Sequence, residues 1–444
     1  MNSTAYVLSI VYKGSVLSAL VYDEHGRTIG VARREFAGGR DDLAVLHPDD
    51  LLSSLILLLD SALRKACILP HELIGVGIAA PEDAVVLWDE NSGSPLGPVR
   101  FLPFHAKDFT KDIEPLVRTW ILEAKTGEAK IREGSTVLLG GIESWLIWNL
   151  SHGAHHVIAS SHRLLGDATS PKDAGAGFLP LDTSIRLAKS VTCASRVGQV
   201  AAPFLGGIPV PITAVATTSV STLFGAGLAD EHEAFVSYDF DGGFITLCSA
   251  QDVQAVNKSA TTFLPLKVDA PNVTTLHALL LAKFESQNTI LQWLQNIPFS
   301  FPNEETLKRR ADLLLHDEQV TLTLASQSSH RAVIAGIGPT TTLEEIYVAA
   351  LRAIVTAVSD AVQEMNRLTG KTIYRLYTDH TGFGNEWIYT LQTTVANVPL
   401  YVRSEDTGSL GIAFLAGMGA NHWDRTKIFE WLTQHISSRV YEAT

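Results

Sequence analysis

The sequence contains the same structural unit twice, once at its start and once just past its middle. Residues Tyr6–Phe36 and Ala234–Val256 both have the pattern of a strand, a glycine-containing turn and a second strand. Such a repeat predicts two related halves that close on a cleft. Turns of Gly, Ser and Thr can bring backbone N–H groups against phosphate oxygens. The repeat therefore favours a two-domain fold with a phosphate site at the turns.

The composition is that of a globular protein with large cores, because 46% of the 444 residues are hydrophobic and 18% are charged. The net charge of −13 argues against nucleic acid or an anionic membrane surface as the main partner. Cys67, Cys193 and Cys248 are too few and too widely spaced to predict a disulfide framework or a zinc site. The sequence has no secretion signal and no apolar stretch of membrane-spanning length, so we expect a cytoplasmic protein.

Strands and helices alternate along the chain, which predicts an α/β fold. In the first half we expect a helix from His47 and strands at Leu73–Ala79 and Val85–Asp89. In the second half the apolar spacing from Leu343 to Met365 predicts a helix of about six turns. The elements expected after it are the strand Ile373–Tyr377, the helix Asn385–Val395, the strand Leu400–Arg403 and the helix Gly411–Gly419.

The predicted boundary between the halves is the polar, glycine-containing connection that begins at Gly225–Asp230. It divides the chain into a first domain of residues 1–228 and a second of residues 229–444. Residues 102–130 are polar and irregular in pattern, and we interpret them as an inserted lid or cap.

Seven strings spread along the chain carry a family resemblance. The two most specific are Gly141–Leu150, with Trp-Leu-Ile-Trp, and Thr407–Gly417, with Ser-Leu-Gly-Ile-Ala. The others are Tyr6–Ile10, Ala19–Gly26, Ile74–Ile78, Val85–Asp89 and Leu223–Gly225. Together they resemble the FGGY carbohydrate kinases, the family of glycerol kinase, xylulokinase and gluconokinase. The resemblance implies two actin-like (ribonuclease H-like) ATPase domains facing an interdomain cleft, and phosphorylation of a sugar or polyol hydroxyl with ATP and magnesium.

The family's proton acceptor is an aspartate shortly before the Leu-Phe-Gly string. Counting back from Leu223, the matching residue here is Thr218, and no Asp or Glu lies in Ala216–Val220. A threonine hydroxyl does not accept a proton near neutral pH. We therefore assign no catalytic residue, and name Asp241 as the candidate substitute.

The phosphate-binding strings depart from the family pattern as well. The first hairpin of the family carries a magnesium-organising aspartate, and Val11, whose side chain has no oxygen atom, stands in its place. The matched cofactor-binding positions are Lys13, Gly14, Ser15, Gly242, Gly243, Gly382 and Gly384. Lys13 is either a phosphate ligand or a solvated turn residue. Asp239 and Asp241 are either metal ligands or solvated turn residues, and the metal ligands stay unknown.

The substrate side is altered too. Glu82 and Asp83 match the Arg-Glu pair of glycerol kinase-like chains, and paired carboxylates can hold sugar hydroxyls. The equally weighted alternative is an ordinary turn between two strands. Four histidines, His152, His155, His156 and His162, lie close to one another in the sequence but lack regular ligand spacing, which favours surface histidines over a metal site.

Phosphoryl transfer depends on positioning and charge compensation, so its parts must be present together. Four altered motifs therefore favour a pseudokinase that still binds a sugar, a nucleotide or a protein partner. The second hypothesis is a working sugar kinase in which Asp239 or Asp241 acts as metal ligand or base and Lys13 binds phosphate. The third is a non-catalytic subunit that pairs with an active relative, and homo-oligomerisation is left open. We expect a small sugar or polyol as ligand, and neither nucleic acid nor membrane as partner.

Overall fold

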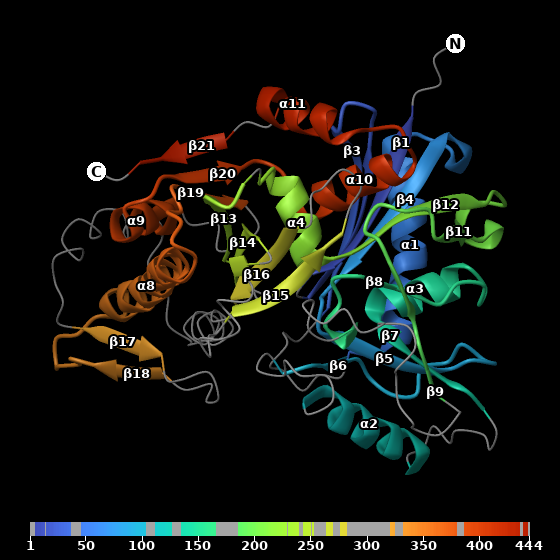
Figure 1. Cartoon of the computed structure of the whole chain (residues 1–444), viewed down its shortest axis with the longest axis horizontal. Coiled ribbons are helices and arrows are strands. Elements are labelled where there is room, and N and C mark those ends of the chain that lie inside the picture. The colour runs from blue at the N-terminus through green and yellow to red at the C-terminus, as the bar shows by residue number, and fades with distance from the viewer. Residues whose placement is uncertain are drawn as a thin grey trace.

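The computed structural model describes most of the chain. The described residues are 5–13, 15–36, 46–103, 112–126, 135–165, 185–228, 230–238, 243–249, 251–252, 263–269, 276–281, 320–324, 332–379, 386–435 and 438–442. Within these ranges two large mixed sheets, one from each half of the chain, are accompanied by helices (Figure 1). The predicted α/β fold is confirmed.

The first sheet has six strands and grows from the first predicted hairpin. In spatial order its strands are β11 (Gly198–Val200), β12 (Val210–Thr217), β4 (Leu73–Ala80), β1 (Tyr6–Lys13), β2 (Val16–Tyr22) and β3 (Thr28–Glu35). β1 pairs antiparallel with β2, whereas β4 runs parallel to both β1 and β12. The carboxyl ends of β1, β4 and β12 therefore lie at one edge of the sheet.

Helix α1 (Pro48–Ala66) packs against β2 and β3 of this sheet. Pro48 suits the first turn because no backbone N–H is needed there, and Asp49 and Asp50 lie at the positive end of the helix dipole. Leu51, Leu55 and Leu59 recur on one face and are fully buried. The helix begins where the sequence predicts it and ends at Cys67, which has a left-handed backbone conformation.

A smaller four-stranded sheet is inserted after β4 and lies at the lower right of Figure 1. Its strands, in spatial order, are β6 (Arg100–Phe101), β5 (Ala84–Asp89), β7 (Val137–Gly141) and β9 (Ile185–Leu187). Helix α3 (Ile142–Leu150) follows β7 directly, and the short strands β8 (Val157–Ala159) and β10 (Lys189–Val191) pair beside it.

Residues 102–130, which are irregular in sequence pattern and which we interpret as a lid or cap, contain the helix α2 (Glu114–Thr126). Ile113, Val117 and Ile121 recur at helical spacing and share a buried apolar cluster with Val85 and Leu139 of the inserted sheet. This short apolar stripe is surrounded by polar residues, which hid the period in the sequence. Residues 104–111 and 127–134 of the expected lid lie outside the described residues.

The second sheet has seven strands and contains the second predicted hairpin. In spatial order its strands are β15 (Phe263–Val268), β16 (Leu276–Leu281), β14 (Gly243–Cys248), β13 (Glu233–Ser237), β19 (Arg375–Asp379), β20 (Leu400–Arg403) and β21 (Ser438–Tyr441). β13 and β14 are antiparallel, as β1 and β2 are in the first sheet. The repeat read from the sequence is therefore present as structure.

The helices predicted for the second half are confirmed as α8 (Leu343–Thr369) and α9 (Glu386–Ala396). α8 begins at a capping box, in which Thr342 Oγ1 accepts from the Glu345 N–H and the Glu345 carboxylate accepts from the Thr342 N–H. The hairpin of β17 (Thr321–Leu324) and β18 (Ala332–Ala335) lies against α8. Buried side chains of α8, α9, β19 and β20 share one apolar core.

Two helices from different halves cross closely. α4 (Thr218–Ala226) packs on α10 (Thr407–Gly419), and α10 also packs on β1, β4 and β12 of the first sheet. A methyl group at Gly225 would lie 1.8 Å from the Thr407 carbonyl oxygen, and one at Gly411 would lie 1.6 Å from that of Ser221. Gly225 is thus a packing residue inside α4, although the sequence placed it at the start of the connection.

Helix α11 (Arg425–His435) also returns to the first sheet (Figure 1). Its Trp431 packs over Gly26 in the β2–β3 turn. The chain after residue 403 therefore contributes to the core beside the first sheet, through α10 and α11. Among the described residues, no helix has both the length and the apolar character needed to cross a bilayer. The division at residues 228 and 229 stays a prediction.

Candidate functional site

Polar side chains gather where the parallel strands of the first sheet end. Ala80 of β4 pairs with Thr217 of β12, and Lys13 is the last residue of β1 on the other side of β4. The turn that follows β4 and the start of α4 therefore lie next to each other. In open α/β sheets, ligands bind outside the carboxyl ends of the strands, so this edge is the candidate site.

Thr218 is the first residue of α4 and is buried. Thr217, just before it, is the N-cap residue, and its hydroxyl lies 2.8 Å from the Ser161 hydroxyl. The first turn of α4 contains no acidic residue. The structure thus places a threonine at the helix start where the sequence match expects a proton acceptor.

Glu82 and Asp83 lie in the turn between β4 and β5, beside Thr217. Both are buried, with exposed fractions of 9% and 7%. Asp83 Oδ2 lies 3.8 Å from the guanidinium of Arg163, and the Arg163 N–H donates to the Glu82 carbonyl oxygen. The residues do form a turn between strands, but carboxylates are seldom buried in a turn unless something holds them.

Arg163 is the cation of this edge and is itself buried. Its guanidinium donates to the carbonyl oxygens of Leu102 and Pro103 at 3.2 and 2.7 Å. These bonds fix the chain that leaves the inserted sheet and hold the positive charge near Asp83. The sequence offered no signal for Arg163, because the pairing spans 80 residues of chain.

Glu143 is the functional candidate that sequence reasoning missed. It was read only as part of the Gly141–Leu150 string, yet it is fully buried in the first turn of α3. Its Oε1 accepts from the Ala159 N–H at 3.5 Å, and its Oε2 has no hydrogen-bond partner among the described residues. Burial raises the pKa of Glu143 from 4.5 to about 8, and the nearby Glu82 carboxylate adds to the rise.

Two nearby histidines are neutral parts of the fold. His162 is buried, its Nε2 bonds the Ala84 carbonyl oxygen, and its Nδ1 accepts from the Leu164 N–H. Burial lowers the pKa of His162 to about 3 and that of His156 to about 4. The expectation of surface histidines was therefore wrong for His162. Both of its ring nitrogens bond to backbone groups, which the sequence does not reveal.

The phosphate side is described only in part. Lys13 is half-buried, Ser15 is buried, and Gly243 begins β14 opposite Ser237. The other predicted positions, Gly14, Asp239, Asp241, Gly242, Gly382 and Gly384, lie outside the described residues.

The described part of the first hairpin does not fit a magnesium ion. The Val11 side chain is buried and has no oxygen atom, and no carboxylate stands between Tyr12 and Ser15 in the sequence. The described ranges contain no group of three or more His, Cys, Asp or Glu residues placed to hold a metal.

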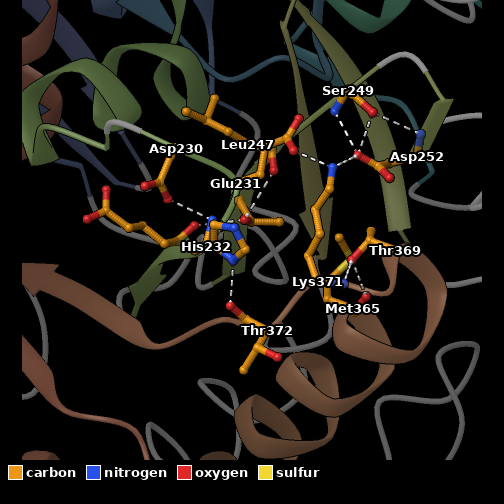
Figure 2. Close-up of polar contacts among 12 residues, drawn as sticks. Asp230, Glu231, His232, Leu247, Ser249, Asp252, Met365, Thr369, Lys371 and Thr372 are labelled. Carbon is orange, nitrogen blue, oxygen red and sulfur yellow. Dashed lines mark hydrogen bonds and ion pairs between the residues drawn. The ribbon is translucent and has the colours of Figure 1, made fainter.

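A second carboxylate cluster lies in the second half, at the amino-terminal end of β13 (Figure 2). The Lys371 ammonium contacts Glu231 and donates to Asp252 Oδ2 at 2.6 Å. Ser249 donates its hydroxyl and its N–H to the same Asp252 oxygen. Burial alone would raise the pKa of Asp252, but the bonds from Lys371 and Ser249 hold it below its usual range. Glu231 is therefore bound to Lys371 as part of this cluster.

Asp230 and His232 fasten the same connection to the turn after α8. The His232 N–H donates to Asp230 Oδ1, His232 Nδ1 lies 2.8 Å from the Thr372 carbonyl oxygen, and its ring stacks on Tyr374. The chain between α4 and β13 is thus held against the second sheet over residues 230–232 (Figure 2).

Comparison with known proteins gives one consistent result. The sequence model of the "FGGY family of carbohydrate kinases, C-terminal domain" matches residues 321–420. A glycerol kinase from Xanthomonas campestris pv. campestris is 24% identical over 457 residues, covering 94% of this chain and 90% of the relative. A glycerol kinase from Lactococcus lactis subsp. lactis is also 24% identical, over 470 residues, covering 95% and 91%.

Solved structures share the fold over nearly the whole chain. Plasmodium falciparum glycerol kinase with ADP superposes with a TM-score of 0.74 at 18% identity, covering 99% of this chain and 94% of that one. A ligand-bound xylulose kinase from Lactobacillus acidophilus gives a TM-score of 0.71 at 13% identity, with the same coverage. The expected two-domain, actin-like fold is confirmed by this likeness.

Proposed function

Because the chain belongs to the FGGY family of carbohydrate kinases, we propose that it binds a small sugar or polyol at the edge of the first sheet while phosphoryl transfer is impaired. The observation that carries this proposal is Thr218, which begins α4 where the family has its proton acceptor. Loss of a general base typically lowers a rate by about 10²–10⁴. A hydroxyl in its place leaves the acceptor alcohol without a group to take its proton.

The binding half of the proposal rests on Glu82 and Asp83. Carboxylates accept hydrogen bonds from hydroxyl groups, and these two are held on a turn at the carboxyl ends of the parallel strands. Arg163 balances one negative charge, so the pair can remain in place before a ligand arrives. Curated relatives include glycerol kinases, and the solved neighbours include a xylulose kinase and a gluconate kinase, so sugars and polyols are the class to test.

A nucleotide is the second ligand to test, because a solved neighbour was determined with ADP. Lys13 and Ser15 are the described residues that would face its phosphates from the first hairpin. A protein that uses ATP would work in the cytoplasm, and we place this one there. Val11 supplies no ligand for magnesium, which is the second reason to expect slow transfer.

A working kinase with a remodelled site is the second candidate function. It is favoured by the position of Glu82, whose carboxyl group belongs to the turn next to Thr217 and Thr218. A carboxylate there could take the proton that Thr218 cannot. Asp241, which the sequence suggested for this role, lies outside the described residues.

Calorimetry with glycerol, xylulose and gluconate tests the binding half. We expect at least one of them to bind the wild-type protein, and Asp83→Asn to weaken that binding about tenfold through loss of one charged hydrogen bond. Glu24→Gln, a change of an exposed carboxylate in the β2–β3 turn, is the matched control and should leave binding unchanged. Failure of all three compounds to bind would contradict the proposed site.

Release of ADP from ATP in the presence of the bound sugar tests the transfer half. The proposal expects background rates. Steady turnover would support the second candidate, and two variants would then locate the base. At saturating sugar, loss of turnover in Glu82→Gln with sugar binding retained, but not in Asp241→Asn, would assign the base to Glu82, and the reverse result would assign it to Asp241.

A further inference from the structure

Glu143 lies in a space that the backbone leaves open for its carboxyl group. β7 ends in Gly140 and Gly141, and a methyl group at Gly141 would lie only 2.2 Å from Glu143 Oε2. The glycine therefore permits the side chain to fold back over the start of α3. This arrangement puts the carboxyl group toward Ala159 and Glu82, with Trp145 fully buried one half-turn further along the helix.

Two segments of the candidate site meet at this carboxyl group. Oε1 accepts from the Ala159 N–H, and two residues later the Ser161 hydroxyl bonds the Thr217 hydroxyl at the start of α4. On the other side lies Glu82, whose carbonyl oxygen accepts from the Arg163 N–H. Glu143 thus borders both the Glu82–Asp83 turn and the chain that supports Thr217.

The charged groups around Glu143 influence whether its carboxyl group keeps its proton. The Glu82 carboxylate, in the turn after β4, is near enough to add to the rise in the pKa of Glu143, while the positive charge of Arg163 lies near Asp83. His162 and His156, on either side of β8, are neutral and bonded to backbone oxygens. Asp89 of β5 pairs with Val137, at the end of β7 away from Gly141, and β7, β8 and β11 carry no titratable side chain.

A negative charge on Glu143 would therefore be buried beside a second carboxylate, with no cation bonded to it among the described residues. Such a charge is costly in a protein interior. The raised pKa, about 8, follows from this geometry. At neutral pH the carboxyl group holds its proton and sits beside Glu82 without repelling it.

We propose that Glu143 is a positioning residue for the sugar site, and that its neutral carboxyl group keeps the Glu82–Asp83 turn and the 159–161 segment in their binding arrangement. This inference rests on the proposed function, because the turn it positions is the proposed sugar-binding element. Ionisation of Glu143 would drive the two carboxylates apart and loosen both segments. Sugar binding would then weaken at alkaline pH through a residue that does not touch the sugar.

Hydrogen-exchange mass spectrometry tests the positioning role without a ligand. Wild-type protein is compared with Glu143→Gln, which mimics the neutral acid, at pH 6 and at pH 9. We expect equal exchange at pH 6. At pH 9, about one unit above its pKa, Glu143 is ionised in most molecules, so we expect residues 80–84 and 159–163 to exchange at least several-fold faster in the wild type. Equal exchange at both values would overturn the proposal.

A comparison within the wild type guards against a variant that folds poorly. Exchange of residues 80–84 is divided by that of residues 233–237, which form a buried strand in the second sheet. A ratio that rises between pH 6 and pH 9 supports the proposal, and a constant ratio contradicts it.

Sugar affinity separates this proposal from the proposed function. A dissociation constant that rises about tenfold per pH unit above the pKa in the wild type but not in Glu143→Gln supports the positioning role. The same rise in both proteins contradicts it. If neither protein binds glycerol, xylulose or gluconate at any pH, the proposed function fails, and the exchange experiment alone decides the role of Glu143.

Discussion

The two carboxylate clusters of this protein are built in opposite ways. In the second half, Lys371 lies between Glu231 and Asp252, and Ser249 adds two hydrogen bonds (Figure 2). In the first half, Glu143 lies beside Glu82 with one long backbone contact and no bonded cation among the described residues. The pKa of Asp252 is accordingly lowered, and that of Glu143 is raised to about 8.

This difference indicates that the Lys371 cluster stabilises the fold, whereas the Glu82–Glu143 cluster belongs to the candidate site. A satisfied cluster such as that of Lys371 fastens loops together, and it lies at the amino-terminal end of β13. A cluster with an unsatisfied carboxyl group lowers stability, and such groups concentrate where a protein binds or reacts. The cluster of Glu82 and Glu143 lies at the carboxyl ends of β4 and β12, where α/β sheets place their ligands.

The largest effect is expected from Arg163, the cation of the first cluster. Arg163→Met would leave Asp83 buried without its cation, and the Leu102 and Pro103 carbonyl oxygens would lose their donor. We expect the free energy of unfolding to fall by about 3–5 kcal/mol, the usual cost of breaking a buried ion pair. Urea unfolding at pH 7 measures it. A loss below about 1 kcal/mol would show that the pair is no different from a surface ion pair.

A gain in stability is expected from Glu143→Gln at pH 8. The unfolded chain loses the Glu143 proton above pH 4.5, whereas the folded protein keeps it until about pH 8. Wild-type stability therefore falls across that interval, and glutamine removes the fall. We expect the variant to be more stable by about 2–4 kcal/mol at pH 8 and nearly equal at pH 4.5. Parallel pH profiles for the two proteins would contradict the raised pKa.

A smaller loss is expected when the cation of the second cluster is removed. Lys371→Met leaves Glu231 and Asp252 facing each other, but the lysine side chain is 28% exposed and water reaches the site. We expect a loss of about 1–3 kcal/mol at pH 7. Arg367→Met, which breaks an exposed ion pair with Glu364 on the same helix, is the control and should change the free energy of unfolding much less. Equal losses would mean that Lys371 stabilises the fold no more than an exposed ion pair does.

The smallest effect is expected from Ser249→Ala, which removes one hydroxyl donor from Asp252 and leaves the backbone N–H bond. The loss should be about 1 kcal/mol at pH 7. Because the pKa of Asp252 is lowered, its contribution is present above the usual aspartate pKa and is lost as the pH falls through the lower folded value. The difference between variant and wild type should therefore shrink at acid pH. The wild-type contribution of Asp252 is lost on acidification, whereas the burial of Glu143 lowers wild-type stability as the pH rises. A difference that grows on acidification would contradict this assignment.

The sequence predicted the elements with strong local patterns. The long apolar period of α8, the proline and acids that start α1, and the two hairpins are local signals, and they appear at or close to the expected positions. α2 was not predicted, because its apolar stripe of Ile113, Val117 and Ile121 is short. The stripe is buried only through its packing against the inserted sheet, which the sequence does not show.

The candidate site could be predicted only in its outline. Thr218, Glu82 and Asp83 were each singled out from the family resemblance. That they lie next to each other depends on the pairing of β12 with β4, which the sequence did not predict. The pairing of Asp83 with Arg163 and the burial of Glu143 could not be predicted. They depend on segments that are distant in sequence and meet only through the tertiary fold.

The most direct test is to measure sugar binding and ADP formation in one preparation of the wild-type protein. We predict a saturable heat of binding for a sugar or polyol of the glycerol, xylulose or gluconate class, with ADP formation at the level seen without sugar. Sugar-dependent ADP formation at a steady rate would contradict the account. It would show that another group accepts the proton of the acceptor hydroxyl, which Thr218 cannot do.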